Sequence, residues 1–285
     1  MWQASAWEWL GPLTLVTVLG LGLLARHWAR RVLPGELLRL GTRQRFYLGA
    51  AWVSLYVGFG GPLSYLDRFL FSAHALQIML LTMVAVPLGC LGVPPVLAAQ
   101  ALKPSWARRL LAFLSKPLWA ILLFTAALSL GVVPSLYDWT VSGPLPLFIS
   151  HLVLTATALL LWWPVLSPVP GLPRLHPSVQ LLYLFLAGIP MMLPQVLITL
   201  SSQPLYPVYA QVPRLYGLSQ VADQQLGGGL MLLGMHLALG AAFVAAFAAW
   251  MRRERREGTL PTPPPTLSVI RPDSSERRVV RRKRG

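Results

Sequence analysis

The chain has 285 residues, of which 55% are hydrophobic and only 12% are charged. A soluble domain carries about 25% charged residues, so this composition excludes an ordinary soluble protein and predicts an all-α, polytopic membrane protein. The formal net charge of +15 does not indicate a nucleic-acid partner, because eleven of the 24 basic residues follow Trp250 and no recognition motif accompanies them.

Seven apolar runs follow one another along the chain, each near the 20 residues that cross a hydrocarbon core of about 30 Å. We therefore expect one bundle of seven transmembrane helices within residues 1–250. The predicted spans are residues 10–25, 46–65, 70–92, 109–133, 146–167, 179–200 and 227–250.

Residues 251–285 form a different kind of segment, which runs from RRERRE through PTPPPT to RRKRG. This segment has too little apolar surface to fold alone, so we expect a disordered, basic cytoplasmic tail. Its arginines either attract anionic lipid at the inner leaflet or only fix the topology.

The basic residues also predict the orientation of the spans. Only Arg68 and Arg214 fall in loops on one side, Lys116 falls within the fourth span, and the other 21 basic residues fall on the opposite side. The positive-inside rule then places the N-terminus outside and the C-terminus in the cytoplasm, in an integral protein of the plasma (inner) membrane.

Histidines inside the predicted spans are candidate functional residues, because polar groups at membrane depth usually face the bundle interior. His74 and His151 each lie about five residues from the outer end of a span, which gives them the same depth of roughly 6–8 Å. Imidazole and thioether groups are neutral ligands that suit copper. The candidate copper ligands are His74, His151, His236, Met235, Met191 and Met192. Hydrogen bonding between helices is the alternative role for the histidines, and core packing is the alternative for the methionines.

The stretch DQQLGGG, residues 223–229, places a second polar group at the mouth of the seventh span. We expect Asp223 to cap that helix, with Gln224 and Gln225 lining an outer vestibule. Gln77 follows His74 at i+3 and shares its helix face. Gly227 and Gly228 are expected to let the seventh helix pack closely against the third and the fifth.

These motifs, with PLYxxY at 204–209, WWPV at 162–165, FSAHxxQ at 71–77 and LGxPP at 91–95, resemble the CtaG-type assembly factors of caa3-type cytochrome c oxidases. The resemblance covers residues 10–250 and implies a seven-span membrane protein that matures the oxidase at its copper centres. Of the histidine-richer site that the resemblance implies, this chain keeps His74, Gln77 and His151.

The expected function is therefore that of an oxidase assembly factor, which holds or delivers copper on the outer side of the membrane. Its partners would be oxidase subunits and an external copper donor. A small-solute or metal transporter and a metal-free scaffold for oxidase subunits remain the alternatives. Two histidines at equal depth also suit axial ligation of haem. We do not expect an enzyme, because the sequence has no nucleophile–base set, phosphate loop or paired carboxylates at one depth.

Overall fold

The computed structural model describes residues 40–256 except 62, 170, 171 and 173, together with residue 258 and scattered positions between 16 and 31. Every regular element of this part is a helix. The predicted first span, residues 10–25, lies largely outside the described residues. So does the tail beyond residue 258.

The longer helices overlap the predicted spans in sequence, and short helices such as α7 and α10 lie between them. In chain order they are α3 (Thr42–Phe59), α4 (Leu63–Leu66), α5 (Phe71–Met79), η2 (Leu80–Ala85), α6 (Val86–Gly92), α7 (Pro95–Ala101), α8 (Ser105–Leu114), α9 (Pro117–Gly131), α10 (Pro134–Thr140), α11 (Pro144–Leu166), α12 (Pro177–Leu200), η3 (Pro207–Tyr209) and α13 (Gln220–Arg256). Proline opens many of them, because its fixed φ suits the first helical position and its missing N–H has no intrahelical partner there anyway.

Four helices of the described part are long and apolar enough to cross a membrane: Phe71–Gly92, α11, α12 and α13. The pair α8 and α9 makes a fifth span if it is counted as one broken helix. The expected count of seven is therefore not confirmed. The second predicted span corresponds to α3, which begins with TRQR and has only 18 residues.

The fourth predicted span is broken rather than continuous. The axes of α8 and α9 differ by 79°. Pro117 opens α9, and the residue before a proline is disfavoured in the helical conformation. Lys116 lies at this break, as the N-cap of α9, with its ammonium 5.1 Å from the Phe113 ring centroid. Lys116, expected within the fourth span, thus lies at the break between two helices and not inside a continuous helix.

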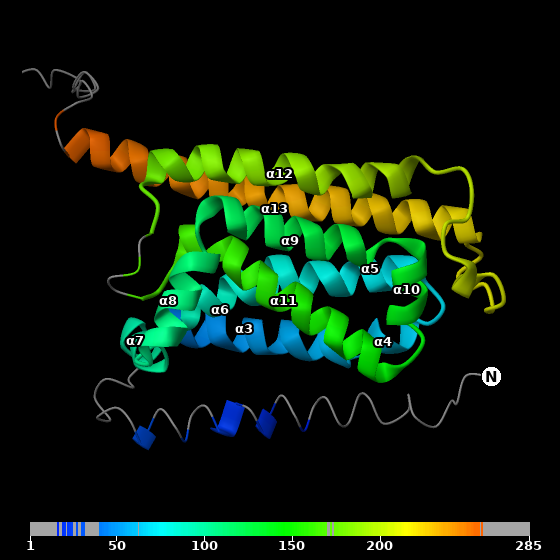
Figure 1. The fold of residues 1–285 in the computed structure, drawn as a ribbon, viewed down its shortest axis with the longest axis horizontal. Coiled ribbons are helices and arrows are strands. Elements are labelled where there is room, and N and C mark those ends of the chain that lie inside the picture. The colour runs from blue at the N-terminus through cyan, green and yellow to red at the C-terminus, as the bar shows by residue number, and fades with distance from the viewer. Residues whose placement is uncertain are drawn as a thin grey trace, which may run out of the picture.

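The long helices lie roughly side by side in one bundle (Figure 1). Helices α12 and α13 run antiparallel along one edge, α13 also packs on α5, and α11 packs on α9. We call the end that carries α4, α10 and residues 201–219 the α10 end, and the end that carries α7, α8, residues 167–169 and residues 174–176 the α8 end. At the α8 end, α13 continues to Arg256, six residues beyond the boundary at residue 250 expected from the sequence.

The third span contains a π-helical segment, η2, between α5 and α6. Such a segment leaves backbone carbonyls without their usual intrahelical partner. The indole of Trp162, from the WWPV motif on α11, donates a hydrogen bond of 2.9 Å to the carbonyl of Thr82 in this segment. The interruption is therefore stabilised by a neighbouring helix.

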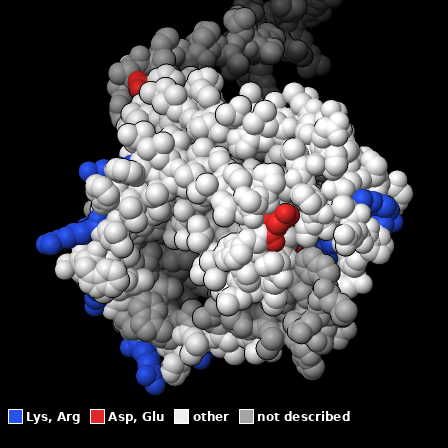
Figure 2. Space-filling view, turned by 45° about the vertical axis from the view of Figure 1, so that its right-hand side comes forward, with Lys and Arg blue, Asp and Glu red and all other residues white. Residues whose placement is uncertain are grey.

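The outer surface of the bundle is apolar along its long helices. On α12 the exposed large side chains recur every three or four residues, which places them on one helix face: Leu182, Phe185, Ile189, Leu193, Leu197 and Leu200. Figure 2 shows neutral residues over most of the described surface in that view, with basic side chains near its edges. This is the surface that a lipid-embedded bundle requires.

Candidate functional site

Two histidine rings meet in the interior at the α10 end. His74 lies in the first turn of α5 and His151 in the second turn of α11, and their ring centroids are 5.4 Å apart at an interplanar angle of 30°. Their side chains are 2% and 0% exposed, respectively. The contact agrees with the equal depth that the sequence predicts for these two residues.

Several polar atoms beside this pair have no hydrogen-bond partner in the described part of the chain. They are Nδ1 of His74, both ring nitrogens of His151 and both amide atoms of Gln77. Gln77 lies one turn below His74 and is fully buried. A buried polar group without a partner costs about 1–3 kcal/mol. Such a concentration of unpartnered donors and acceptors on two helices is unusual in a packed core.

Aromatic side chains enclose the histidine pair. The Tyr137 ring, from α10, meets His74 edge-on at 5.0 Å, and the Phe59 ring, from α3, meets His151 edge-on at 6.0 Å. Tyr137 is fully buried. The pair is thus shielded by residues from two further helices, so its environment has a low dielectric constant.

A hydrogen-bonded chain leads from this enclosure toward the loop after α4. The Tyr209 hydroxyl donates to the backbone carbonyl of Asp67 at 2.7 Å, so the Tyr137 hydroxyl is the donor in its 2.6 Å bond to Tyr209. Burial raises the pKa of Asp67 well above its usual value, although Arg68 beside it acts in the opposite direction. Burial and the neighbouring Tyr209 likewise raise the pKa of Tyr137.

Asp223 connects two helices at the α10 end. Its carboxylate accepts hydrogen bonds from the backbone N–H groups of Phe71 (2.6 Å) and Ser72 (3.2 Å), and from the Ser72 hydroxyl. These N–H groups begin α5, so Asp223 caps the helix that carries His74. Helix α13 itself is capped by Ser219, whose hydroxyl accepts from the N–H of Ala222. The expectation that Asp223 caps its own helix is therefore wrong.

The two glutamines that follow hold the preceding loop. Gln224 accepts a hydrogen bond from the N–H of Leu205 (2.7 Å) and donates one to the carbonyl of Gln203 (3.2 Å). Gln225 donates to the carbonyl of Ser201 (3.1 Å). Gln224 is only 1% exposed. These bonds use the amide groups to close the α12–α13 connection, rather than leaving them free along a vestibule.

The glycines of the motif sit at two close helix contacts. A Cβ atom on Gly227 would lie 2.4 Å from the Phe71 ring on α5, and one on Gly228 would lie 2.6 Å from the Thr199 hydroxyl on α12. Close packing against the third predicted span is thus confirmed. The second partner is α12, the sixth span, and not the fifth.

His236 and Met192 lie in a different place from the histidine pair. They line a surface groove between α12 and α13, where Met192 is 49% exposed. The His236 ring nitrogens contact two backbone carbonyls, that of Leu232 at 2.6 Å and that of Gly188 at 3.3 Å. Within the described residues no group of three or more His, Cys, Asp or Glu side chains is arranged to hold a metal ion. The structure therefore does not bring His236 to His74 and His151.

The two other methionines predicted as ligands are fully buried in the bundle core. Met191 on α12 and Met235 on α13 both belong to the main hydrophobic cluster. The Met235 sulfur accepts a hydrogen bond of 2.9 Å from the Gln195 amide. The side-chain amide oxygen of Gln195, Oε1, has no partner in the described part of the chain. Met235 thus pairs with a buried amide of α12.

With this geometry in place, similarity to known proteins decides the family. The family model "Cytochrome c oxidase caa3 assembly factor (Caa3_CtaG)" matches residues 19–253. The chain belongs to this family. It is also 30% identical over 207 residues to uncharacterized proteins of Mycobacterium bovis and Mycobacterium tuberculosis, which covers 66% of this chain and 31% of each relative. The chain thus spans about a third of the length of these curated relatives. No solved structure shows significant similarity to the chain.

For this member of the caa3 assembly-factor family, two buried polar residues were not predicted from the sequence. Gln195 is fully buried, and Tyr137 is a wall of the histidine enclosure. Gln195 was signalled by its position inside an apolar span, in IPMMLPQ, where an amide needs a partner. Tyr137 gives no such signal, because a tyrosine between two spans is equally typical of a membrane interface.

Proposed function

We propose that this protein is a membrane assembly factor of cytochrome c oxidase, which holds or delivers copper with His74 and His151 as its binding pair. The observation that carries this proposal is the contact of two buried imidazoles whose nitrogens lack partners in the described chain. Family membership supports the oxidase as the target.

The donor set fits copper as a transient cargo. Neutral imidazole is a good copper ligand, and it enters a low-dielectric site without burying a charge. Two histidines leave coordination positions open for a ligand from a donor or from an oxidase subunit. A carrier needs such open positions, because the ion must leave in the next step.

The ring nitrogens of His151, which lack hydrogen-bond partners in the described residues, also distinguish a copper-binding protein from a metal-free scaffold. A histidine that only joins helices is expected to bond a neighbouring polar group. Neither ring nitrogen of His151 has such a partner within the described residues. The histidine pair therefore favours a binding role over a purely structural one.

The proposed side of action follows from the distribution of basic residues. With the N-terminus outside, the α10 end and its histidine pair face the external compartment, where a copper donor would meet them. A reporter fused after Trp250 tests this orientation. It should be active only in its cytoplasmic form, and activity of an externally active reporter at this position would reverse the assignment.

Metal analysis of purified protein from copper-supplemented cells tests the binding pair. We expect copper to co-purify with the wild-type protein and to be lost from the His74→Phe, His151→Phe double variant, in which aromatic rings keep the packing. His176→Phe, at an exposed histidine of the α8 end, is the matched control and should retain copper. Oxidase from cells that carry the double variant should be copper-deficient.

Two other results would redirect the proposal. Full copper content in the double variant, with normal oxidase maturation, would leave the scaffold function. Copper uptake into vesicles that contain the purified protein would instead indicate a transporter.

A further inference from the structure

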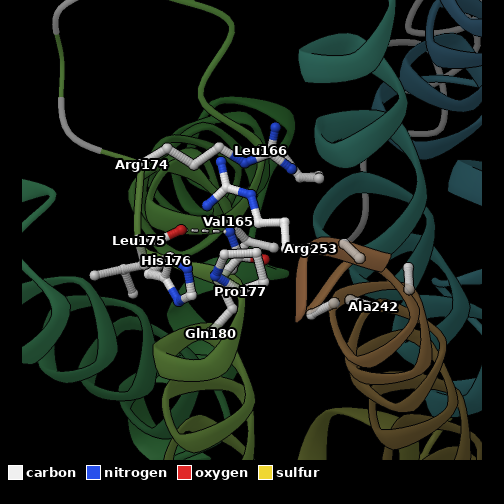
Figure 3. Close-up of a pocket in the computed structure, with 12 residues that line it drawn as sticks. Val165, Leu166, Arg174, Leu175, His176, Pro177, Gln180, Ala242 and Arg253 are labelled. Carbon is white, nitrogen blue, oxygen red and sulfur yellow. Dashed lines mark hydrogen bonds between the residues drawn. The ribbon is translucent and has the colours of Figure 1, made fainter. Parts of the chain in front are cut away.

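A second pocket lies at the α8 end, far along the bundle from the histidine pair. It has a volume of about 470 Å³ and is formed by the end of α11, the loop before α12, the first turn of α12 and the last turns of α13 (Figure 3). None of its lining residues belongs to the candidate copper set. The pocket is therefore a separate site, and a role for it does not depend on copper binding at the histidine pair.

Two arginines from distant parts of the chain converge on this pocket. Arg174 comes from the loop before α12 and Arg253 from the end of α13, and Figure 3 shows their guanidinium groups beside one another. None of the twelve lining residues is acidic. Loss of solvent around its guanidinium, and then repulsion by Arg253, lower the pKa of Arg174. Two like charges at one pocket with no acid in its lining form a site for a shared anion.

The start of α12 lies at the same pocket. Pro177 is the first residue of this 24-residue helix and lines the pocket with His176, its N-cap. Pro177 has no N–H, and the N–H of Gln180 donates to the His176 carbonyl at 2.9 Å, so α12 contributes the positive end of its dipole, which favours negative charge at this point. The Gln180 amide is already used, since it donates to the Leu175 carbonyl at 2.8 Å.

The remaining wall of the pocket is apolar. It is built from small side chains of α13 and from the last turn of α11: Ala242, Ala245, Ala246, Ala249, Val165 and Leu166. A pocket with a cationic rim and an apolar wall fits a molecule that carries a phosphate next to hydrocarbon. The position at the ends of three apolar helices is also the level at which lipid headgroups lie.

We propose that this pocket binds the phosphate group of an anionic phospholipid, held between Arg174 and Arg253. The bound headgroup joins the α11–α12 loop to the end of α13. This site lies within the helical bundle and does not require residues 258–285. It differs in this respect from general attraction of lipid by the basic tail.

Lipid retention by purified protein tests the proposal. The full chain is reconstituted in nanodiscs that contain either phosphatidylglycerol or only phosphatidylcholine, and the lipid that remains bound after detergent extraction is measured by native mass spectrometry. We expect the wild-type chain to retain phosphatidylglycerol. Each single variant, Arg174→Gln or Arg253→Gln, should retain the lipid roughly fivefold more weakly, and the double variant about thirtyfold more weakly.

A matched charge control separates the pocket from the tail. Arg252→Gln, Arg255→Gln removes two exposed charges from the same helix end without changing a lining residue, and it should retain the lipid. Equal loss in both double variants would overturn the proposal, because it would show attraction by net charge alone. Retention of phosphatidylcholine at the same level would also overturn it.

A third arm distinguishes a lipid from a soluble anion. Inorganic phosphate is added to lipid-free protein in detergent, and thermal unfolding is recorded. The headgroup proposal predicts little stabilisation by millimolar phosphate, because the apolar wall is then unused. A large, Arg174- and Arg253-dependent stabilisation by phosphate alone would overturn the lipid assignment and identify a site for a soluble phosphate.

Discussion

The carboxylate of Asp223 accepts a hydrogen bond of 2.6 Å from the backbone N–H of Phe71, 152 residues earlier in the chain. This bond fixes the start of α5, and His74 lies only three residues further along. Helix α13 therefore positions the helix that carries half of the histidine pair. The polar motif at the start of α13 contributes to the site through this bond.

Replacement of Asp223 should weaken this connection in a graded way. Asp223→Ala removes the cap of α5 and should lower stability by about 1–2 kcal/mol, a normal cost for a lost helix cap. Asp223→Asn keeps one acceptor oxygen and should lose less. Thermal unfolding in detergent measures both. Ser219→Ala, which removes only the cap of α13, serves as the control, and it should leave copper content unchanged. A copper content that falls in Asp223→Asn at unchanged stability would instead indicate a direct role of the charge.

The three consecutive glycines provide a matched series for close packing. Gly227→Ala and Gly228→Ala each place a Cβ atom within 3 Å of a neighbouring helix, so each should destabilise the fold by about 1–3 kcal/mol. Gly229→Ala meets nothing within 4 Å and should be neutral or stabilising by up to about 1 kcal/mol, since alanine favours helix. The yield of folded protein and its unfolding temperature are the measurements. A similar loss in all three variants would contradict the packing explanation.

Stability should depend on pH through Asp67. Burial raises the folded-state pKa of this carboxyl above its ordinary value of 3.8. The protonated Asp67 carboxyl therefore contributes its full share of the folding stability below pH 3.8. This contribution is lost as pH rises through the folded-state pKa, because a buried carboxylate is then formed. In Asp67→Asn this part of the pH dependence should disappear, and the variant should be more stable than the wild type at neutral pH. Unfolding temperatures recorded from pH 4 upward test this, and parallel curves for the two proteins would refute it.

Gln77 should show opposite effects on stability and on copper binding. Its amide is fully buried without a partner in the described residues, so Gln77→Leu should stabilise the fold by about 1–3 kcal/mol. If the amide faces bound copper or a water ligand of it, the same change should lower copper content. Gln195→Leu offers a comparison at a second buried amide, whose nitrogen already donates to Met235. Unchanged copper in Gln77→Leu would limit the site to the two histidines.

The sequence by itself determined the helical class, the approximate position of most long helices and the common level of His74 and His151. These properties follow from the local length and apolarity of segments, and from the fixed rise per residue of a helix. The common level of His74 and His151 could be predicted in this way, because the level of a side chain along a helix depends only on the number of residues from the helix end.

Only the tertiary structure decided which way each helix face points and which distant groups pair. His236 has a depth that the sequence predicts, yet rotation of α13 turns its ring to Gly188 and the groove between α12 and α13. The sequence predicts that Asp223 caps its own helix, yet α13 begins at Gln220 and the Asp223 carboxylate reaches α5. Such choices depend on contacts between segments far apart in the chain, where the free energies of close packing and of buried hydrogen bonds select one arrangement.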